Sequence, residues 1–157
     1  MGLLNDVNNP HVLGLDAREI FFLEDRVILV EGQEDVIFYQ AICEQLTTSL
    51  NGTFFGWGVG GAEKMPIIAQ MLKDLGFERI VGILDGNRKN MLPDLQKQFP
   101  EFNFFSIPVD DVRTKEPRSA KDAVEGLVDR KGFLQDQYKD IIRNLIVEIN
   151  MKLDGEV

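Results

Sequence analysis

The sequence predicts an α/β fold in which a four-stranded parallel sheet is flanked by helices and followed by a C-terminal helical appendage. Two observations predict it. Short runs rich in Val, Ile and Phe alternate with longer segments whose apolar residues recur at helical spacing. Two of these runs end abruptly in an acid followed by glycine, which marks the carboxyl end of a strand. Because parallel strands need helical crossovers, this alternation over about eighty residues indicates a doubly wound, Rossmann-like sheet.

We expect three divisions of the chain. Residues 1–15 hold turn formers without a clear period and are interpreted as a leader or linker, with His11 unsuited to catalysis there. Residues 16–111 form the α/β core, which opens on a short helix capped by Asp16 and Glu19. Residues 112–157 form a charged loop and C-terminal helices that pack on the core.

The elements follow from local patterns in chain order. The four strands are expected at residues 27–30, 53–58, 80–84 and 102–107. Helical spacing of apolar residues predicts the helices between them, which run from Val36 to Leu46, from Ala62 to a C-terminal Gly76, and from Met91 to Pro100. Two further helices are expected, one near residues 121–129 and a longer one over residues 142–153.

Composition restricts the classes of function. The formal net charge of −9 over 157 residues argues against a free-standing, non-specific nucleic-acid binder, which gains affinity from Lys and Arg contacts to phosphates. A nuclease with this charge would need a metal ion to bridge its acids to phosphate. The single cysteine, Cys43, lies on an apolar helical stripe and is expected to pack. With no signal peptide or membrane-spanning run in the sequence, we expect a cytoplasmic protein without membrane contact.

Acids recur where the predicted strands end. Glu31 follows the first strand and Asp85 the third, and if those strands are neighbours their backbones lie about 4.8 Å apart. Both carboxylates would then reach one shared cation. Oxygen ligands without a His or Cys cluster favour Mg²⁺ or Mn²⁺. The candidate metal ligands at this rim are Glu31, Asp35, Asp85, Asp110 and Asp111, with Lys64, Arg113, Lys115 and Lys121 nearby.

A glycine-rich turn precedes the second helix. Gly60 and Gly61 are followed by Lys64, but the segment lacks the glycine and hydroxyl residue of a P-loop. Most such turns serve only as tight turns. The functional interpretation is that free amides at the helix start receive a phosphate. Candidate phosphate or DNA contacts are therefore Gly60, Gly61, Lys64 and Arg88.

The order of these motifs resembles the Toprim domain of topoisomerases, primases and overcoming-lysogenisation-defect (OLD) nucleases. The resemblance rests on the apolar run ending in Glu31-Gly32, on Asp35, on Gly60-Gly61 and on the run ending in Asp85-Gly86. It covers residues 16–111, and the approach segment from Ala17 to Gly32 is most similar to the OLD group. In that group the Toprim module follows an ABC-type ATPase.

The resemblance implies a DNA endonuclease that uses Mg²⁺ or Mn²⁺, with an ATPase domain upstream or in trans and a possible homodimer. Glu31 would ligate metal or act as general acid or base, and Asp85 would be the first acid of the family's Asp-x-Asp motif. Asp35 resembles the extra acid of OLD nucleases. Their further acid would be Asp110 or Asp111, and their transition-state lysine Lys115 or Lys121.

The sequence departs from the family where a second aspartate is expected. Asn87 stands there as a candidate metal ligand through its neutral amide oxygen, which removes one negative charge. Metal affinity should fall as a result. Two alternatives therefore stand beside an active nuclease: a catalytically weak or inactive Toprim-like regulatory or dimerisation module, and a phosphoacceptor at Asp85. The phosphoacceptor ranks low because it needs an acidic pair on the first strand and a Lys after a last strand that is missing.

Overall fold

The fold is a four-stranded parallel sheet between two layers of helices, as predicted. A computed structural model describes residues 26–117 and 123–155. Strands β1 (Arg26–Leu29), β2 (Thr53–Phe54), β3 (Arg79–Leu84) and β4 (Asn103–Ser106) pair in the order β2-β1-β3-β4, all parallel. The registers Leu29↔Gly82 and Leu84↔Ser106 align the carboxyl ends of the three longer strands. Residues that follow these strands therefore meet at one edge of the sheet.

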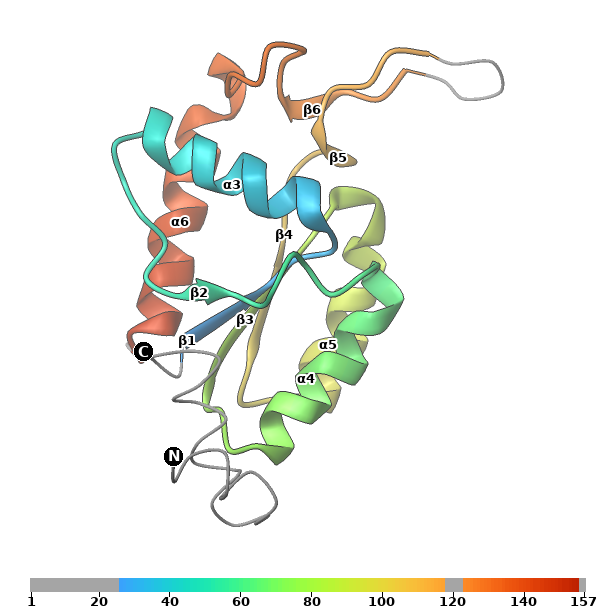
Figure 1. Ribbon diagram of the computed structural model, residues 1–157, viewed down its shortest axis with the longest axis vertical. Coiled ribbons are helices and arrows are strands. Elements are labelled where there is room, and N and C mark those ends of the chain that lie inside the picture. The colour runs from blue at the N-terminus through green and yellow to red at the C-terminus, as the bar shows by residue number, and fades with distance from the viewer. Residues whose placement is uncertain (1–25, 118–122, 156–157) are drawn as a thin grey trace, which may run out of the picture.

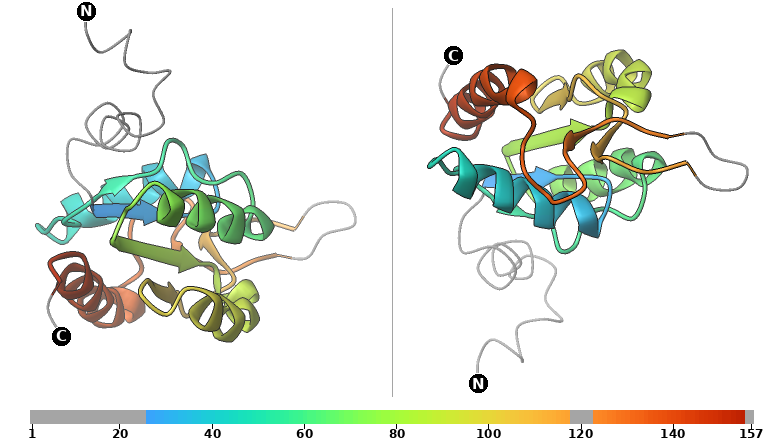
Figure 2. Two further views of the ribbon diagram at one scale, coloured as in Figure 1. Left: turned by 90° about the horizontal axis from the view of Figure 1, so that it is seen from below. Right: turned by 90° about the horizontal axis from the view of Figure 1, so that it is seen from above.

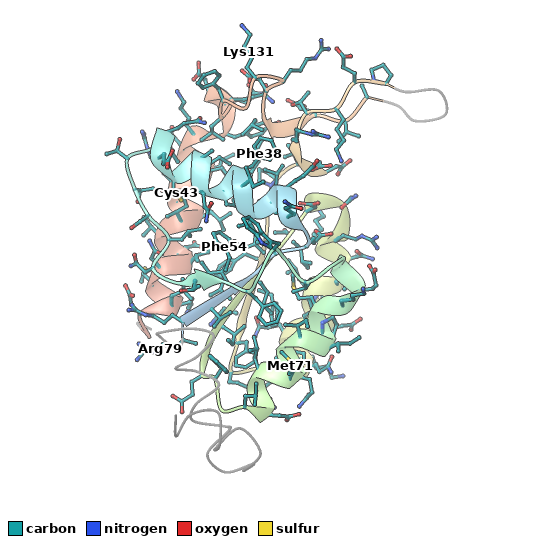
Figure 3. The ribbon with its side chains drawn as sticks, in the orientation of Figure 1. Phe38, Cys43, Phe54, Met71, Arg79 and Lys131 are labelled. Atoms are coloured by element: carbon teal, nitrogen blue, oxygen red, sulfur yellow. The ribbon has the colours of Figure 1, made fainter. Side chains whose placement is uncertain are left out.

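Each face of the sheet carries its own helices and its own apolar core (Figure 1). Helices α3 (Gln33–Gln45) and α6 (Lys139–Leu153) cover one face, and α4 (Met65–Asp74) and α5 (Leu92–Gln98) cover the other. Cys43 lies on the buried face of α3 and packs in the core, as expected. Phe38, on the same helix, packs against the same cluster (Figure 3). Strands β1 and β3 are buried on both faces, which explains their unbroken apolar sequences.

Short 3₁₀ segments lead into the helices at the carboxyl edge. These are η1 (Ala62–Lys64) before α4, η2 (Gly86–Met91) before α5 and η3 (Asp136–Tyr138) before α6. The predicted strand over residues 53–58 is shorter than expected, because Gly56 and Gly58 adopt positive φ angles that end the ladder after Phe54. The leader and the short helix at its end lie outside the described residues.

The prediction of a helix near residues 121–129 is wrong for residues 123–129, the part of this range that the structure describes. Residues 111–113 form strand β5 (Asp111–Arg113), which pairs in parallel with β6 (Gly126–Val128). Thr114 Oγ1 fixes the pair by donating to the Val128 carbonyl and accepting from the Gly126 amide. Gly126 disfavours a helix, and a Cβ atom there would overlap the Arg113 backbone. Beyond this pair the chain projects away from the sheet as an arm (Figure 2).

No helix within residues 26–117 and 123–155 combines the length and the hydropathy that a membrane span requires.

Close backbone approach at Gly86 gives a testable stability difference. A Cβ atom at residue 86 would overlap the carbonyl oxygen of Val109, which accepts the Gly86 amide at 2.7 Å. Gly32 is a matched control, because a Cβ atom there meets nothing within 4 Å and its φ of −152° is extended. We expect Gly86→Ala to lower the free energy of unfolding by about 2–4 kcal/mol and Gly32→Ala by less than about 1 kcal/mol, measured by urea denaturation. Equal effects would contradict this packing.

Candidate metal site

Three carboxylates from separate parts of the chain converge at the carboxyl edge of the sheet. Asp35 lies in the first turn of α3, Asp85 directly after β3, and Asp111 begins β5. One oxygen from each lies within 4.8 Å of the others. Asp35 is 8% exposed and is the buried charged residue of the described core. The sheet thus gathers acids that are 50 and 26 residues apart in the pairs Asp35–Asp85 and Asp85–Asp111.

Glu31 holds this edge together from the end of β1. Its Oε2 accepts a hydrogen bond from the backbone N–H of Asp85 at 2.7 Å. The expected juxtaposition of Glu31 and Asp85 is therefore present in the structure. Its predicted role in metal binding stays a prediction, because the three mutually close carboxylates are those of Asp35, Asp85 and Asp111.

Backbone contacts fix the position of each acid. The Gly32 amide donates to Asp35 Oδ2 at 2.9 Å, which places this carboxylate against the start of α3. The Ile107 amide donates to the Leu84 carbonyl at 3.0 Å, and Gly86 donates to Val109 at 2.7 Å. These two bonds tie the segment after β4 to the end of β3. They carry Asp111 towards Asp85.

Burial, together with neighbouring negative charges, raises the pKa of Asp85 and of Asp35. Burial is the main cause at Asp85, followed by the negative charges of Asp35, Glu31 and Asp111, and together they raise its pKa to about 8. Burial likewise raises the pKa of Asp35 to about 6, with Glu31 and Asp111 adding to the shift while the Gly32 amide opposes it. At neutral pH the Asp85 carboxyl therefore holds a proton that a bound cation would displace.

Tyr39 is a buried residue of this region that is absent from the candidate residues predicted from the sequence. It follows Asp35 by one helical turn and is 6% exposed. Burial raises the pKa of its phenol, and the charges of Asp35, Asp85, Glu31 and Asp111 raise it further. The signal that would have found it is the spacing of four residues from Asp35. Tyr39 is therefore a neutral side chain that belongs to the apolar core and lies near the acids.

Two cations lie beside the acids. Lys115 Nζ is 2.6 Å from Asp111 Oδ2, so this candidate lysine contacts the cluster directly. Arg113 Nη2 is 3.4 Å from Glu34 Oε1 in the first turn of α3. Lys121, the other candidate lysine, lies outside the described residues.

Of the two aspartates between which the sequence left the choice open, the structure brings Asp111 into the cluster. Asp110 is exposed and lines a separate groove of about 590 Å³ together with Lys89 and Glu148. Asn87 and Arg88 are exposed in η2. No contact in the structure tests their predicted roles.

The amides at the glycine-rich turn are not free, contrary to the functional interpretation of that segment. Gly60 and Gly61 both donate to the carbonyl oxygen of Glu31, at 3.0 and 2.9 Å. An anion would have to displace these bonds. Gly58, at φ 89°, packs so closely on Gly32 that a Cβ atom would lie 2.6 Å from its Cα. The turn therefore holds the Glu31-Gly32 backbone in place, and Lys64 is exposed beside Gly60.

The donor set fits a hard divalent cation. Three carboxylate oxygens within 4.8 Å of one another, with raised pKa values at Asp35 and Asp85, form an excess of negative charge that a small cation would neutralise. Carboxylate oxygens are the ligands that Mg²⁺ and Mn²⁺ prefer. Lys115 offsets one charge of this set, through Asp111.

Comparison with known proteins gives one match. Residues 22–86 match the family described as "Overcoming lysogenization defect protein-like, TOPRIM domain". The matched segment contains Glu31, Asp35 and Asp85, whereas Asp111 and Lys115 lie beyond it. No curated protein matches the chain. No solved structure matches it either.

Proposed function

We propose, from the premise that residues 22–86 are a Toprim domain of the OLD-like family, that this chain cleaves DNA phosphodiester bonds with a divalent metal ion. One observation carries the proposal. Asp111, which lies outside the matched segment, supplies a third carboxylate within 4.8 Å of those of Asp35 and Asp85. This acid gives the site three carboxylates although Asn87 is neutral.

Asp35, Asp85 and Asp111 would hold the ion. Bound Mg²⁺ or Mn²⁺ would lower the pKa of a water molecule and neutralise charge on the phosphodiester. The protons on Asp85 and Asp35 would leave as the ion enters, because a ligating carboxylate must be ionised.

Glu31 would act as the general base. Its carboxylate would accept a proton from the attacking water, while the hydrogen bond from the Asp85 amide keeps Oε2 in position. Lys115 would face the negative charge that develops on the phosphate oxygens, since its ammonium already lies at the edge of the cluster. DNA is the proposed substrate, and an ABC-type ATPase domain is the proposed partner.

The test is a plasmid-cleavage assay with a matched pair of variants. Asp111→Asn removes a cluster carboxylate, whereas Asp110→Asn removes the neighbouring exposed acid. With Mg²⁺ or Mn²⁺ at millimolar concentration, we expect supercoiled plasmid to be nicked or linearised by the wild type, and EDTA to stop it. Asp111→Asn should lower the rate by about 10²-fold or more and Asp110→Asn by less than about threefold.

A second candidate function is a regulatory or dimerisation module without catalysis, which the neutral Asn87 favours. The same assay separates it from the nuclease. A folded wild type that binds no Mn²⁺ and cuts no plasmid at millimolar metal would remove the nuclease proposal and leave this one.

A further inference from the structure

We propose that Arg113 is a substrate-binding residue of this site, whose guanidinium holds the phosphodiester that is cleaved. The inference rests on the proposed function and adds to it the group that receives the negative charge of the DNA. Neither the family resemblance nor the motif order assigns this residue.

The geometry of β5 places Arg113 next to the carboxylates. Side chains alternate along a strand, so Asp111 and Arg113 lie on one face while Val112, 1% exposed, points into the core. The Arg113 amide donates to Asp111 Oδ1 at 3.3 Å. Its side chain reaches the first turn of α3, where Glu34 is the chain neighbour of Asp35. Arg113 therefore spans the two elements that supply Asp111 and Asp35.

The guanidinium has a donor without a partner. Arg113 Nε is buried and makes no hydrogen bond to any of the described residues. A buried donor left unpaired is destabilising, so most such groups in proteins are paired. The remaining contact is weak, because the Nη2–Oε1 distance to Glu34 is 3.4 Å and the Glu34 side chain is 53% exposed. A phosphate oxygen arriving at the site would replace Glu34 at Nη2 of this side chain, which is 38% exposed.

Charge gives a second argument for the same ligand. Asp35, Asp85 and Asp111 lie within 4.8 Å of one another, so their ionised forms repel a phosphodiester. Lys115 is already engaged by Asp111 at 2.6 Å. Arg113 is bound more loosely, and its planar guanidinium offers parallel N–H donors that match two phosphate oxygens. The free donor and the geometry both point to an anion with several acceptor oxygens.

The test compares Arg113→Gln with Glu34→Gln, the two halves of the ion pair. If Arg113 only supports the fold through Glu34, both variants should lose the same activity. If Arg113 binds phosphate, Arg113→Gln should lower the single-turnover cleavage rate by about 10²-fold, whereas Glu34→Gln should stay within about threefold of the wild type. Arg113→Lys should recover part of the loss. Arg130→Gln, which breaks the exposed pair with Glu116, is the control for charge alone and should stay within about threefold.

A measurement without cleavage keeps this inference separate from the proposed function. DNA affinity is measured by fluorescence anisotropy with a labelled duplex in Ca²⁺, and Arg113→Gln should weaken it about tenfold relative to Arg130→Gln. A wild type that never cleaves would defeat the proposed function, and the affinity difference would still decide on Arg113. Equal affinities for Arg113→Gln and Arg130→Gln would overturn the inference. So would equal cleavage losses for Arg113→Gln and Glu34→Gln.

Discussion

Replacement of Asp85 by asparagine is expected to abolish metal-dependent DNA cleavage, with a loss of at least about 10³-fold in rate. Asp85 supplies one of the three mutually close carboxylates, and its backbone N–H donates to Glu31 Oε2. An amide at this position keeps the size of the side chain but removes a charge that a divalent cation needs. Initial rates of plasmid nicking in Mg²⁺ and Mn²⁺ measure the effect.

The control for this variant is Asp94→Asn. Asp94 is an exposed acid in the first turn of α5, so its replacement changes the net charge by the same amount. Its rate should remain within about twofold of the wild type. If Asp85→Asn cleaved as fast as Asp94→Asn, the carboxylate cluster would not be the catalytic site.

The second large effect is a loss of stability in the metal-free protein as pH rises from about 4 to about 8. Burial and neighbouring acids raise the pKa of folded Asp85 to about 8 and of Asp35 to about 6, against 3.8 as the usual value for aspartate. Between these pH values the folded protein holds protons that the unfolded chain has released. Their stabilising contribution is complete below pH 4 and disappears as pH rises through the folded pKa values.

Urea unfolding in EDTA at several pH values measures this dependence. Asp85→Asn removes the main titrating group. At pH 8 its free energy of unfolding should therefore exceed that of the wild type by about 1–3 kcal/mol, after allowance for solvent screening. The two proteins should differ less at pH 5. Addition of Mg²⁺ should stabilise the wild type at pH 8 and leave Asp85→Asn nearly unchanged. A wild type whose stability rises relative to Asp85→Asn over this range would contradict the assigned cause.

Strand ends could be predicted from the sequence, because buried parallel strands are continuous apolar runs that stop at a charged residue. Val27 to Glu31 and Ile80 to Asp85 have this form, and both lie where expected. The meeting of Glu31 and Asp85 was predicted on the condition that their strands are neighbours, and the order β2-β1-β3-β4 meets that condition. The choice between Asp110 and Asp111 could not be made, because it depends on how the chain turns after Pro108 and on the tie between Gly86 and Val109.

Other features depended on contacts between distant residues. The predicted helix near residues 121–129 gave way to β6, whose partner β5 and bridging Thr114 lie 12 residues or more upstream of it along the chain. The amides of Gly60 and Gly61 were predicted to be free to bind a phosphate, but both donate to the Glu31 carbonyl oxygen. Local sequence patterns do not indicate which distant residues pair. The fold class could therefore be predicted, whereas the arrangement of residues around the site could be predicted only in part.

Anomalous diffraction from a crystal soaked in Mn²⁺ tests the central claim most directly. The account predicts a manganese peak bound by the carboxylates of Asp35, Asp85 and Asp111. A well-ordered site without manganese at millimolar concentration, or a peak held only by acids elsewhere on the surface, would contradict it.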